Sequence, residues 1–250
     1  MNDLFLKKLC DCDRISGERN IIKHTGFLTD EEFSLYLSHK SSLYAHNFPF
    51  GGFSHAQRKM VIWPGYCEDA QAAAGIISLI KAEPKSPRFA GELSHRDFLG
   101  ALMNLGIERE CIGDICIKKE EKEAFIFCEK SIAEVILSEL SRVKNTDLKL
   151  KEIPFGEFDY VPEFLDIKIN AASLRADAVL SALLKLSRAQ TSSLIREEKV
   201  FIGGSLCETG DKKITDGAVI SVRGFGKYIF DGIEAESRKG RFFMKIRKYI

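Results

Sequence analysis

The chain has 250 residues, of which 45% are hydrophobic and 29% are charged, and its formal net charge is +1. This composition is typical of a soluble globular protein, and the length allows two or three small domains with hydrophobic cores. The nearly balanced charge argues against a generally polycationic surface. No run of about 18 apolar residues occurs, which argues against a transmembrane helix.

Positive charge is concentrated in the last third of the chain. Residues 163–250 contain 16 Lys and Arg against 11 Asp and Glu, whereas the residues before them contain 21 against 25. A local cationic excess of this size is what a confined binding site for a polyanion requires.

The cysteines indicate neither disulfides nor a metal site. There are seven of them, an odd number, and the chain does not begin with the apolar run of a signal peptide. Reduced thiols in the cytoplasm are the expected state. Because Cys10 and Cys12, and Cys111 and Cys116, lack the spacing of zinc-ligand pairs, we expect no metal and no cofactor.

The first part of the chain, residues 1–57, is predicted to be helical. Thr29 followed by Glu32 forms a capping-box pattern ahead of an apolar stretch. The segment 50–59 has two alternative interpretations: a glycine turn with cations that contact RNA, or a simple connection to the first strand of the next domain.

Residues 58–153 are predicted to form a second domain. The expected strands are 60–63, 75–82 (alternatively a helix end), 114–118, 124–128 and 147–153, and the expected helices are 94–105 and 132–143. The order β-α-β-β-α-β favours a ferredoxin-like unit, so the fold class is α+β. Residues 154–162 are predicted to be a linker.

Residues 163–250 are predicted to form a small module of two short helices and β-hairpins. Each helix has a buried stripe at helical spacing, and Ser187 stands where the second helix needs an N-cap. On the opposite face of that helix, the spacing aligns Arg188, Ser192, Arg196 and Lys199. Such a row is either a solvated helix face or a phosphate-binding surface.

This module resembles the S-four RNA-binding domain. The resemblance rests on Arg175, Asp177 and Leu180 at the first helix and on Ser187-Arg188 at the second. Across the whole chain, further segments resemble the YlmH family, namely 50–53, 57–59, 93–102, 112–114, 220–226 and 245–250. The chain departs from the family at Glu198, where Gly is favoured, and at Gly203, where Asn is favoured.

The cations of the module and the resemblance together give the expected binding residues. The expected RNA-binding residues are Arg175, Lys185, Arg188, Gln190, Arg196, Lys199, Lys212, Arg223 and Lys227, with secondary contacts at Arg58, Lys59, His95, Arg96 and Arg241. The basic tail 238–248 either stacks its aromatics on bases or forms a final strand that buries Phe243 and Ile246.

No catalytic site is expected. The His95-Arg96-Asp97 triplet imitates a kinase loop, but Leu102 stands where that loop requires Asn. The resemblance implies a non-enzymatic, cytoplasmic protein, monomeric off the ribosome, that binds ribosomal RNA of the large subunit and peptidyl-tRNA in ribosome-associated quality control. Two alternatives remain: an RNA-modifying enzyme of the pseudouridine synthase type, in which the module would come first, and a protein-binding scaffold for cell division.

Overall fold

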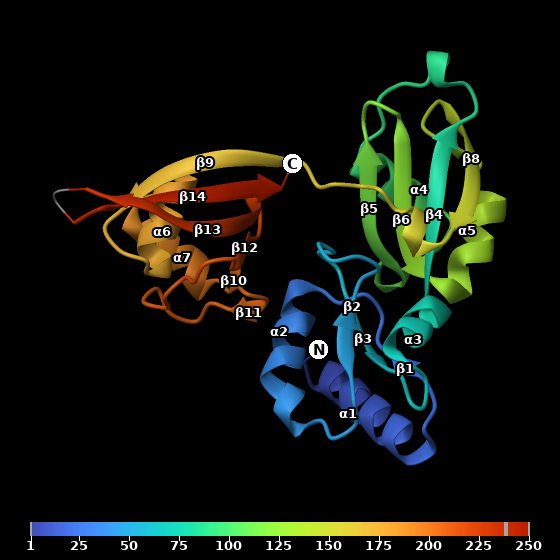
Figure 1. Cartoon of the computed structure of the whole chain (residues 1–250), viewed down its shortest axis with the longest axis horizontal. Helices are drawn as coiled ribbons and strands as arrows, with labels where there is room; N and C mark the ends of the chain where they lie inside the picture. The colour runs from blue at the N-terminus through green and yellow to red at the C-terminus, as the bar shows by residue number, and fades with distance from the viewer. Residues whose placement is uncertain (1, 238–239, 250) are drawn as a thin grey trace. The chain divides into compact units, whose positions relative to one another are not determined.

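The computed structural model of the protein describes residues 2–237 and 240–249, and Figure 1 shows its elements in chain order. Two compact units divide the chain. The first contains the residues up to Thr29 together with Lys40–Tyr160, and the second contains Asp30–His39 together with the residues from Val161 onward. Both units combine helices with antiparallel sheets, which makes the fold α+β. No helix in the described residues has the length and apolar character needed to cross a bilayer.

The N-terminal segment is not wholly helical, so that expectation was wrong. After α1 (Asn2–Arg19), the short strands β1 (Lys23–His24) and β2 (Phe48–Phe50) pair on either side of β3 (Met60–Trp63) in an antiparallel sheet. Strands of two or three residues are too short to show an alternating pattern, and they form here because the buried strand β3 provides their hydrogen-bond partners.

A five-stranded antiparallel sheet forms the centre of the first unit, with strand order β5-β6-β4-β8-β7. Its strands are β4 (Ile77–Pro84), β5 (Ile112–Lys118), β6 (Glu123–Glu129), β7 (Arg142–Val143) and β8 (Thr146–Ile153). Its helices are α3 (Asp69–Ile76), α4 (His95–Asn104) and α5 (Ala133–Glu139). From β4 to β8 the elements follow the expected strand–helix–strand–strand–helix–strand order, apart from the short strand β7, which precedes β8.

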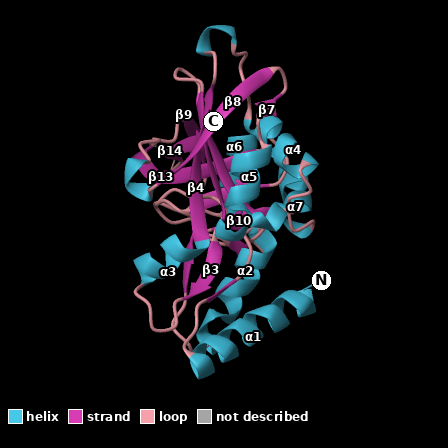
Figure 2. Ribbon diagram, turned by 90° about the vertical axis from the view of Figure 1, so that its right-hand side faces the viewer, coloured by secondary structure: helices cyan, strands magenta, loops and turns pink. Residues whose placement is uncertain are grey.

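Each face of this sheet has its own core. Ile80 and Ile126 pack with Phe98 of α4 and Ile136 of α5, and Figure 2 shows both helices on one side of β4. On the other face, the next residues along the strands, such as Phe125 and Phe127, pack in a second cluster. Residues 154–160, expected to be a linker, contribute aromatic rings to that cluster instead of crossing solvent.

Two predicted elements of this unit have different limits in the structure. The helix expected over 132–143 ends at Glu139, and Arg142–Val143 turns back as β7 against β8. Lys144 in the turn has a φ of 49°, a left-handed conformation that a continuing helix does not contain. The strand expected from residue 75 begins at Ile77, because α3 runs directly into β4.

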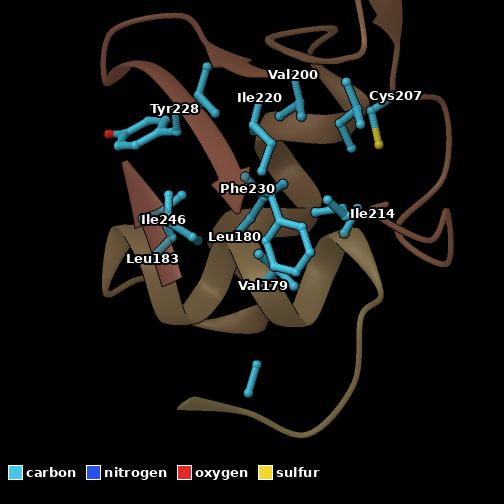
Figure 3. Packing of buried hydrophobic residues seen from close by; sticks show 14 of the residues in the cluster. Val179, Leu180, Leu183, Val200, Cys207, Ile214, Ile220, Tyr228, Phe230 and Ile246 are labelled. Carbon is cyan, nitrogen blue, oxygen red and sulfur yellow. The ribbon is translucent and has the colours of Figure 1, made fainter. Parts of the chain in front are cut away.

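The second unit combines a six-stranded antiparallel sheet with three helices. The strand order is β11-β10-β12-β13-β14-β9. The strands are β9 (Phe164–Ala171), β10 (Val200–Ile202), β11 (Ser205–Leu206), β12 (Val219–Val222), β13 (Gly226–Glu236) and β14 (Phe242–Tyr249), and the helices are α2 (Asp30–His39), α6 (Ala176–Leu184) and α7 (Arg188–Arg196). Figure 3 shows Leu180 of α6 packed with Phe230 of the sheet in its core.

The end of the chain forms strand β14, which was one of the two interpretations of the basic tail. In β14, Met244 and Ile246 are buried, whereas Phe243 is 43% exposed. Phe243 was therefore wrongly assigned to the core, because the buried face of the strand carries the even-numbered positions. Two cations of the expected basic tail, Arg238 and Lys239, lie outside the described residues.

Candidate RNA-binding surfaces

The start of α7 is fixed by a capping box. The backbone N–H of Gln190 donates to Ser187 Oγ (3.2 Å), and the backbone N–H of Ser187 donates to Gln190 Oε1 (2.9 Å). Gln190, an expected RNA contact, therefore already holds the helix end. Arg188 occupies the first turn and is exposed, and within the described residues it makes no hydrogen bond or ion pair. Its guanidinium is thus available to an anion from outside.

The start of α6 carries a second cation. Arg175 stands at the N-cap and binds Asp177 in a two-point contact, with Nε–Oδ1 at 3.1 Å and Nη2–Oδ2 at 2.8 Å. This contact with Arg175 is the main reason that the pKa of Asp177 is lowered, and the charge of Arg188 lowers it further. The starts of the two helices therefore bring Arg175 and Arg188 near the same carboxylate.

The chain around residues 210–213 adds two lysines to this place. The carbonyl oxygen of Lys212 accepts from the backbone N–H of Ala176 at 2.8 Å, and Lys213 forms an isolated β-bridge with Arg175. We call the group Arg175, Arg188, Lys212 and Lys213 the α6–α7 surface. Lys213 was not among the expected residues, and its adjacency to Lys212 is the sequence signal that could have identified it.

The other cations of α6 and α7 are less available or lie apart. Lys185 is exposed at the C-cap of α6, with a φ of 55°. Arg196 donates weakly to Ser193 Oγ at 3.4 Å, and Lys199 forms an ion pair with Glu197 at 2.7 Å. Glu198 adopts a φ of 55°, so the left-handed end of α7 is kept without the Gly that the family favours.

A shallow groove runs beside α7, with a volume of about 550 Å³. Ser192, Ile195 and Arg196 line it from the helix, and Thr209 and Gly210 line it from the opposite loop. The carbonyl oxygen of Gly210 accepts from the backbone N–H of Asp177, so the groove extends from Arg196 toward the α6–α7 surface. Glu198 and Glu208 at its wall oppose an anion there, which favours the α6–α7 surface as the main cationic site.

Arg223 and Lys227 are engaged by carboxylates of α2. Arg223 Nη2 lies 2.8 Å from Glu31 Oε1, and Lys227 Nζ lies 3.1 Å from Asp30 Oδ1. Asp30 also accepts from the hydroxyl of Ser221 at 2.9 Å. We call this group the α2 contact: Asp30 and Glu31 of α2 with Ser221, Arg223 and Lys227 of β12, β13 and the turn between them.

Backbone packing supports the α2 contact. Ser34 Oγ accepts the backbone N–H of Leu206 on the edge strand β11 at 2.8 Å, and α2 lies beside β11 in Figure 1. Gly204 has a φ of 82°, and a Cβ there would lie 2.6 Å from a ring carbon of Phe33. The helix therefore covers the sheet edge at close range, and its carboxylates reach cations that the sequence predicted to be free for RNA.

In the first unit, three of the expected secondary contacts lie in a cationic cluster. Arg58 Nε and Arg109 Nη1 donate to the same acceptor, the carbonyl oxygen of Ile112. Partial burial lowers the pKa of His95, and so do the charges of Arg109, Arg58 and Arg96, although its ring keeps contact with solvent. We call Arg58, His95, Arg96 and Arg109 the arginine cluster. Arg109 was not expected, because Glu108 and Glu110 on either side make it look like part of a neutral surface.

The remaining secondary contacts do not join this cluster. Lys59 is partly buried where the chain enters β3. Arg241 belongs to the second unit and donates to both the side chain and the backbone of Asn170, at 2.6 and 3.0 Å. The five expected secondary residues are therefore divided between the two units.

The His95-Arg96-Asp97 triplet has a structural explanation. Asp97 accepts from the backbone N–H and the hydroxyl of Ser94, which caps α4, and it forms an ion pair with Lys144 at 2.8 Å. Lys144 and then Ser94 lower the pKa of Asp97 to about 2. A carboxylate held in this way stays ionised and is occupied in capping the helix.

The described residues contain no group of three or more His, Cys, Asp or Glu side chains placed to hold a metal ion. Every cysteine is a free thiol. Burial raises the pKa of the Cys116 thiol. Partial burial also raises the pKa of the Cys111 thiol. Raised thiol pKa values disfavour the thiolate that metals and electrophiles require.

Comparisons with known proteins agree with an RNA-binding role. A family model described as "Putative RNA-binding domain in YlmH" matches residues 78–157, the span from β4 to the end of the sheet. The chain is similar to the ribosome-associated protein quality control protein P2 of Bacillus subtilis (strain 168), with 24% identity over 244 residues that cover 95% of this chain and 91% of that protein.

A solved structure described as cell division protein ylmH from Streptococcus pneumoniae is also similar. It is 24% identical, has a TM-score of 0.48, and the match covers 62% of this chain and 93% of that chain. The family model accounts for the central sheet, and the Bacillus relative extends the similarity to nearly the whole length. The chain is therefore similar to the YlmH family over residues 78–157 by the family model and over nearly its whole length by the Bacillus relative.

Proposed function

We propose that this protein binds structured ribosomal RNA on the large ribosomal subunit, in contact with peptidyl-tRNA, during quality control of stalled translation in the cytoplasm. The observation that carries the proposal is the α6–α7 surface, where Arg188 is exposed without a partner in the described residues. The Bacillus relative, whose name describes a ribosome-associated quality control protein, supports the ribosome as the partner.

The chemistry of this surface suits phosphates. A guanidinium offers up to five N–H donors in a planar fork that matches phosphate oxygens. Arg188 lies beside the first turn of α7, where backbone N–H groups also favour an anion. Shape and phosphate contacts are how folded RNA is mostly recognised, so no base-reading pocket is required.

We further propose a domain assignment that goes with this function. Residues 58–153 would act as a ferredoxin-like domain and residues 163–250 as an S-four type RNA-binding domain, with residues 1–57 in support. The order of the strands in both sheets supports these assignments. A non-enzymatic role is supported by the engagement of Asp97 in helix capping.

The test is sedimentation of the full chain with purified ribosomal subunits. The wild-type protein should migrate with the large subunit and not with the small one, and the double variant Arg188→Ala/Lys212→Ala should stay at the top of the gradient. Circular dichroism of the variant checks that it is folded. Equal co-migration of the wild type with both subunits, or of the folded double variant with the large subunit, would contradict the proposal.

A further inference from the structure

The arginine cluster is a place where like charges are held together by the backbone. The strand pairing of β5 with β6 is irregular between Ile112 and Ile115, and such an irregularity leaves backbone groups outside the ladder. The carbonyl oxygen of Ile112 accepts from both Arg58 and Arg109, and that of Gly113 accepts from Arg109 at 3.5 Å. Backbone carbonyl groups thus hold both guanidinium groups at one irregularity of the strand pairing.

The position of Arg58 is determined in further detail. Its Nη2 donates to the carbonyl oxygen of Phe27 at 2.6 Å and to that of Arg109 at 3.4 Å. The backbone N–H groups of Gln57 and Arg58 donate to Asp114 at 2.6 and 3.1 Å. The two arginines are therefore held in a fixed geometry before any ligand arrives, which reduces the entropy lost on binding.

Arg109 keeps donors available. In the part of the chain that the structure describes, its recorded hydrogen bonds all come from Nη1, so Nε and Nη2 have no protein acceptor and no carboxylate lies within ion-pair distance. Burial, followed by the nearby charge of Arg58, lowers the pKa of Arg109 to about 10 even though the charge of Asp114 raises it. Burial and a neighbouring cation thus both disfavour the charge of Arg109, and a bound anion would stabilise that charge.

His95 and Arg96 add to the same field from the start of α4. The charged groups that act on His95 are Arg109, Arg58 and Arg96, all of them cations. Arg96 is exposed, so an anion from solution can reach it. One carboxylate, Asp114, lies near these cations: it accepts from the backbone N–H groups of Gln57 and Arg58, and its charge partly offsets the effect of Arg58 on Arg109.

We propose that the arginine cluster is a second RNA-backbone site, in which Arg109, Arg96 and His95 bind a phosphate of RNA and His95 takes up a proton when the phosphate binds. This inference rests on the proposed RNA-binding function and places a separate contact in the first unit. The ligand class is the phosphodiester of a folded RNA, as in the proposed function, and free phosphate is the alternative that the experiment below separates from it.

The proton uptake has a definite sign. Without ligand, the cations around His95 favour its neutral form, so its pKa is lowered from the usual value. A phosphate replaces repulsion by attraction and raises that pKa, so RNA affinity should increase as the pH falls through the interval between the two values. His95→Gln should remove this pH dependence, because the Gln side chain does not take up a proton in this pH range.

The experiment follows the His95 pKa by NMR in the full chain, alone, with a synthetic RNA hairpin and with inorganic phosphate, and the spectrum of His95→Gln assigns the signal. Saturating RNA should raise the pKa clearly, and inorganic phosphate at the same phosphorus concentration should raise it much less. Arg96→Ala should lower RNA affinity roughly three- to tenfold, whereas Lys151→Ala, an exposed lysine on β8 of the same sheet, should change it less than about twofold.

The outcomes separate this site from the function on which it depends. If the hairpin binds and the pKa of His95 does not move, or if Lys151→Ala costs as much affinity as Arg96→Ala, the cluster is structural and the inference is wrong. If inorganic phosphate shifts the pKa as strongly as RNA, the site takes free phosphate and the RNA assignment is wrong. If no RNA binds at all, the proposed function fails as well.

Discussion

The α6–α7 surface and the α2 contact belong to one unit and present similar side chains to solvent, but their charges are used differently. At the α6–α7 surface, Arg188 makes no ion pair in the described residues, although the charge of Asp177 lies near it. At the α2 contact, Arg223 and Lys227 are matched by Glu31 and Asp30. The difference teaches that a cation in an RNA-binding module is a candidate ligand only after its partners within the protein are known.

The largest expected effect is that of salt concentration on RNA affinity. If the α6–α7 surface neutralises three phosphates, a fourfold rise in salt should lower RNA affinity roughly 20- to 40-fold, from a log–log slope of about −0.7 to −0.9 per phosphate. Filter binding of a large-subunit RNA fragment at several salt concentrations measures the slope. An RNA affinity that does not depend on salt would contradict the proposal that this surface binds RNA phosphates.

Arg188→Ala should have the next largest effect. We expect RNA affinity to fall roughly tenfold, or about 1.4 kcal/mol, and the salt slope to become shallower by about one phosphate. The free energy of unfolding should stay unchanged or rise by up to about 0.5 kcal/mol, because a cation at a helix N-terminus is mildly unfavourable. Thermal unfolding and filter binding of the same preparation measure both quantities.

Arg223→Ala is the matched control for Arg188→Ala, since it removes an arginine from the same unit at the α2 contact. It should change RNA affinity less than about threefold and lower the free energy of unfolding by at most about 1 kcal/mol, because the ion pair with Glu31 is exposed. If this variant loses as much affinity as Arg188→Ala, the comparison between the two regions is wrong.

Asp30→Asn sharpens the comparison from the other side. The substitution leaves the shape of the side chain but removes the charge that holds Lys227 and weakens the acceptor of Ser221. We expect the free energy of unfolding to fall by about 1 kcal/mol, as measured by urea unfolding, and RNA affinity to stay within threefold of the wild type. A large gain in affinity would show that α2 masks a binding surface.

The smallest effect is expected outside both regions. Cys111→Ser/Cys116→Ser should leave RNA affinity within about twofold of the wild type, with a loss of stability because Cys116 is buried. Filter binding measures the affinity, and metal analysis of the wild type and the variant tests the expectation of no metal. Stoichiometric zinc in the wild type, absent from the variant, would overturn that expectation.

Local features of the site could be predicted from the sequence. Ser187 as the N-cap, and the buried stripe with Thr191 and Ile195, depend on neighbours within one helix, and the structure contains them as expected. The exposure of Arg188 follows from the same periodicity. Similarly, the expected strands 114–118 and 124–128 are present as parts of β5 and β6, which pair across the short turn between them.

Long-range features could not be predicted in this way. Asp30 and Lys227 are far apart in the sequence, and no periodicity links a helix near the start of the chain to a strand near its end. The carbonyl oxygens that hold Arg109 become available through an irregularity of strand pairing, which leaves no mark on hydrophobic alternation. Tertiary partners therefore decided which predicted cations remain available.

The position of α2 has a consequence for how the molecule is made. The helix is synthesised early, between two parts of the first unit, but the strands that receive Ser34 and Asp30 are among the last residues to leave the ribosome. During translation, α2 therefore leaves the ribosome before its partner strands, and the first unit, whose sequence flanks α2 on both sides, can fold before α2 packs against the second unit. A fragment that begins at Val161 would likewise lack this helix, and its β11 edge would be open to pairing with other chains.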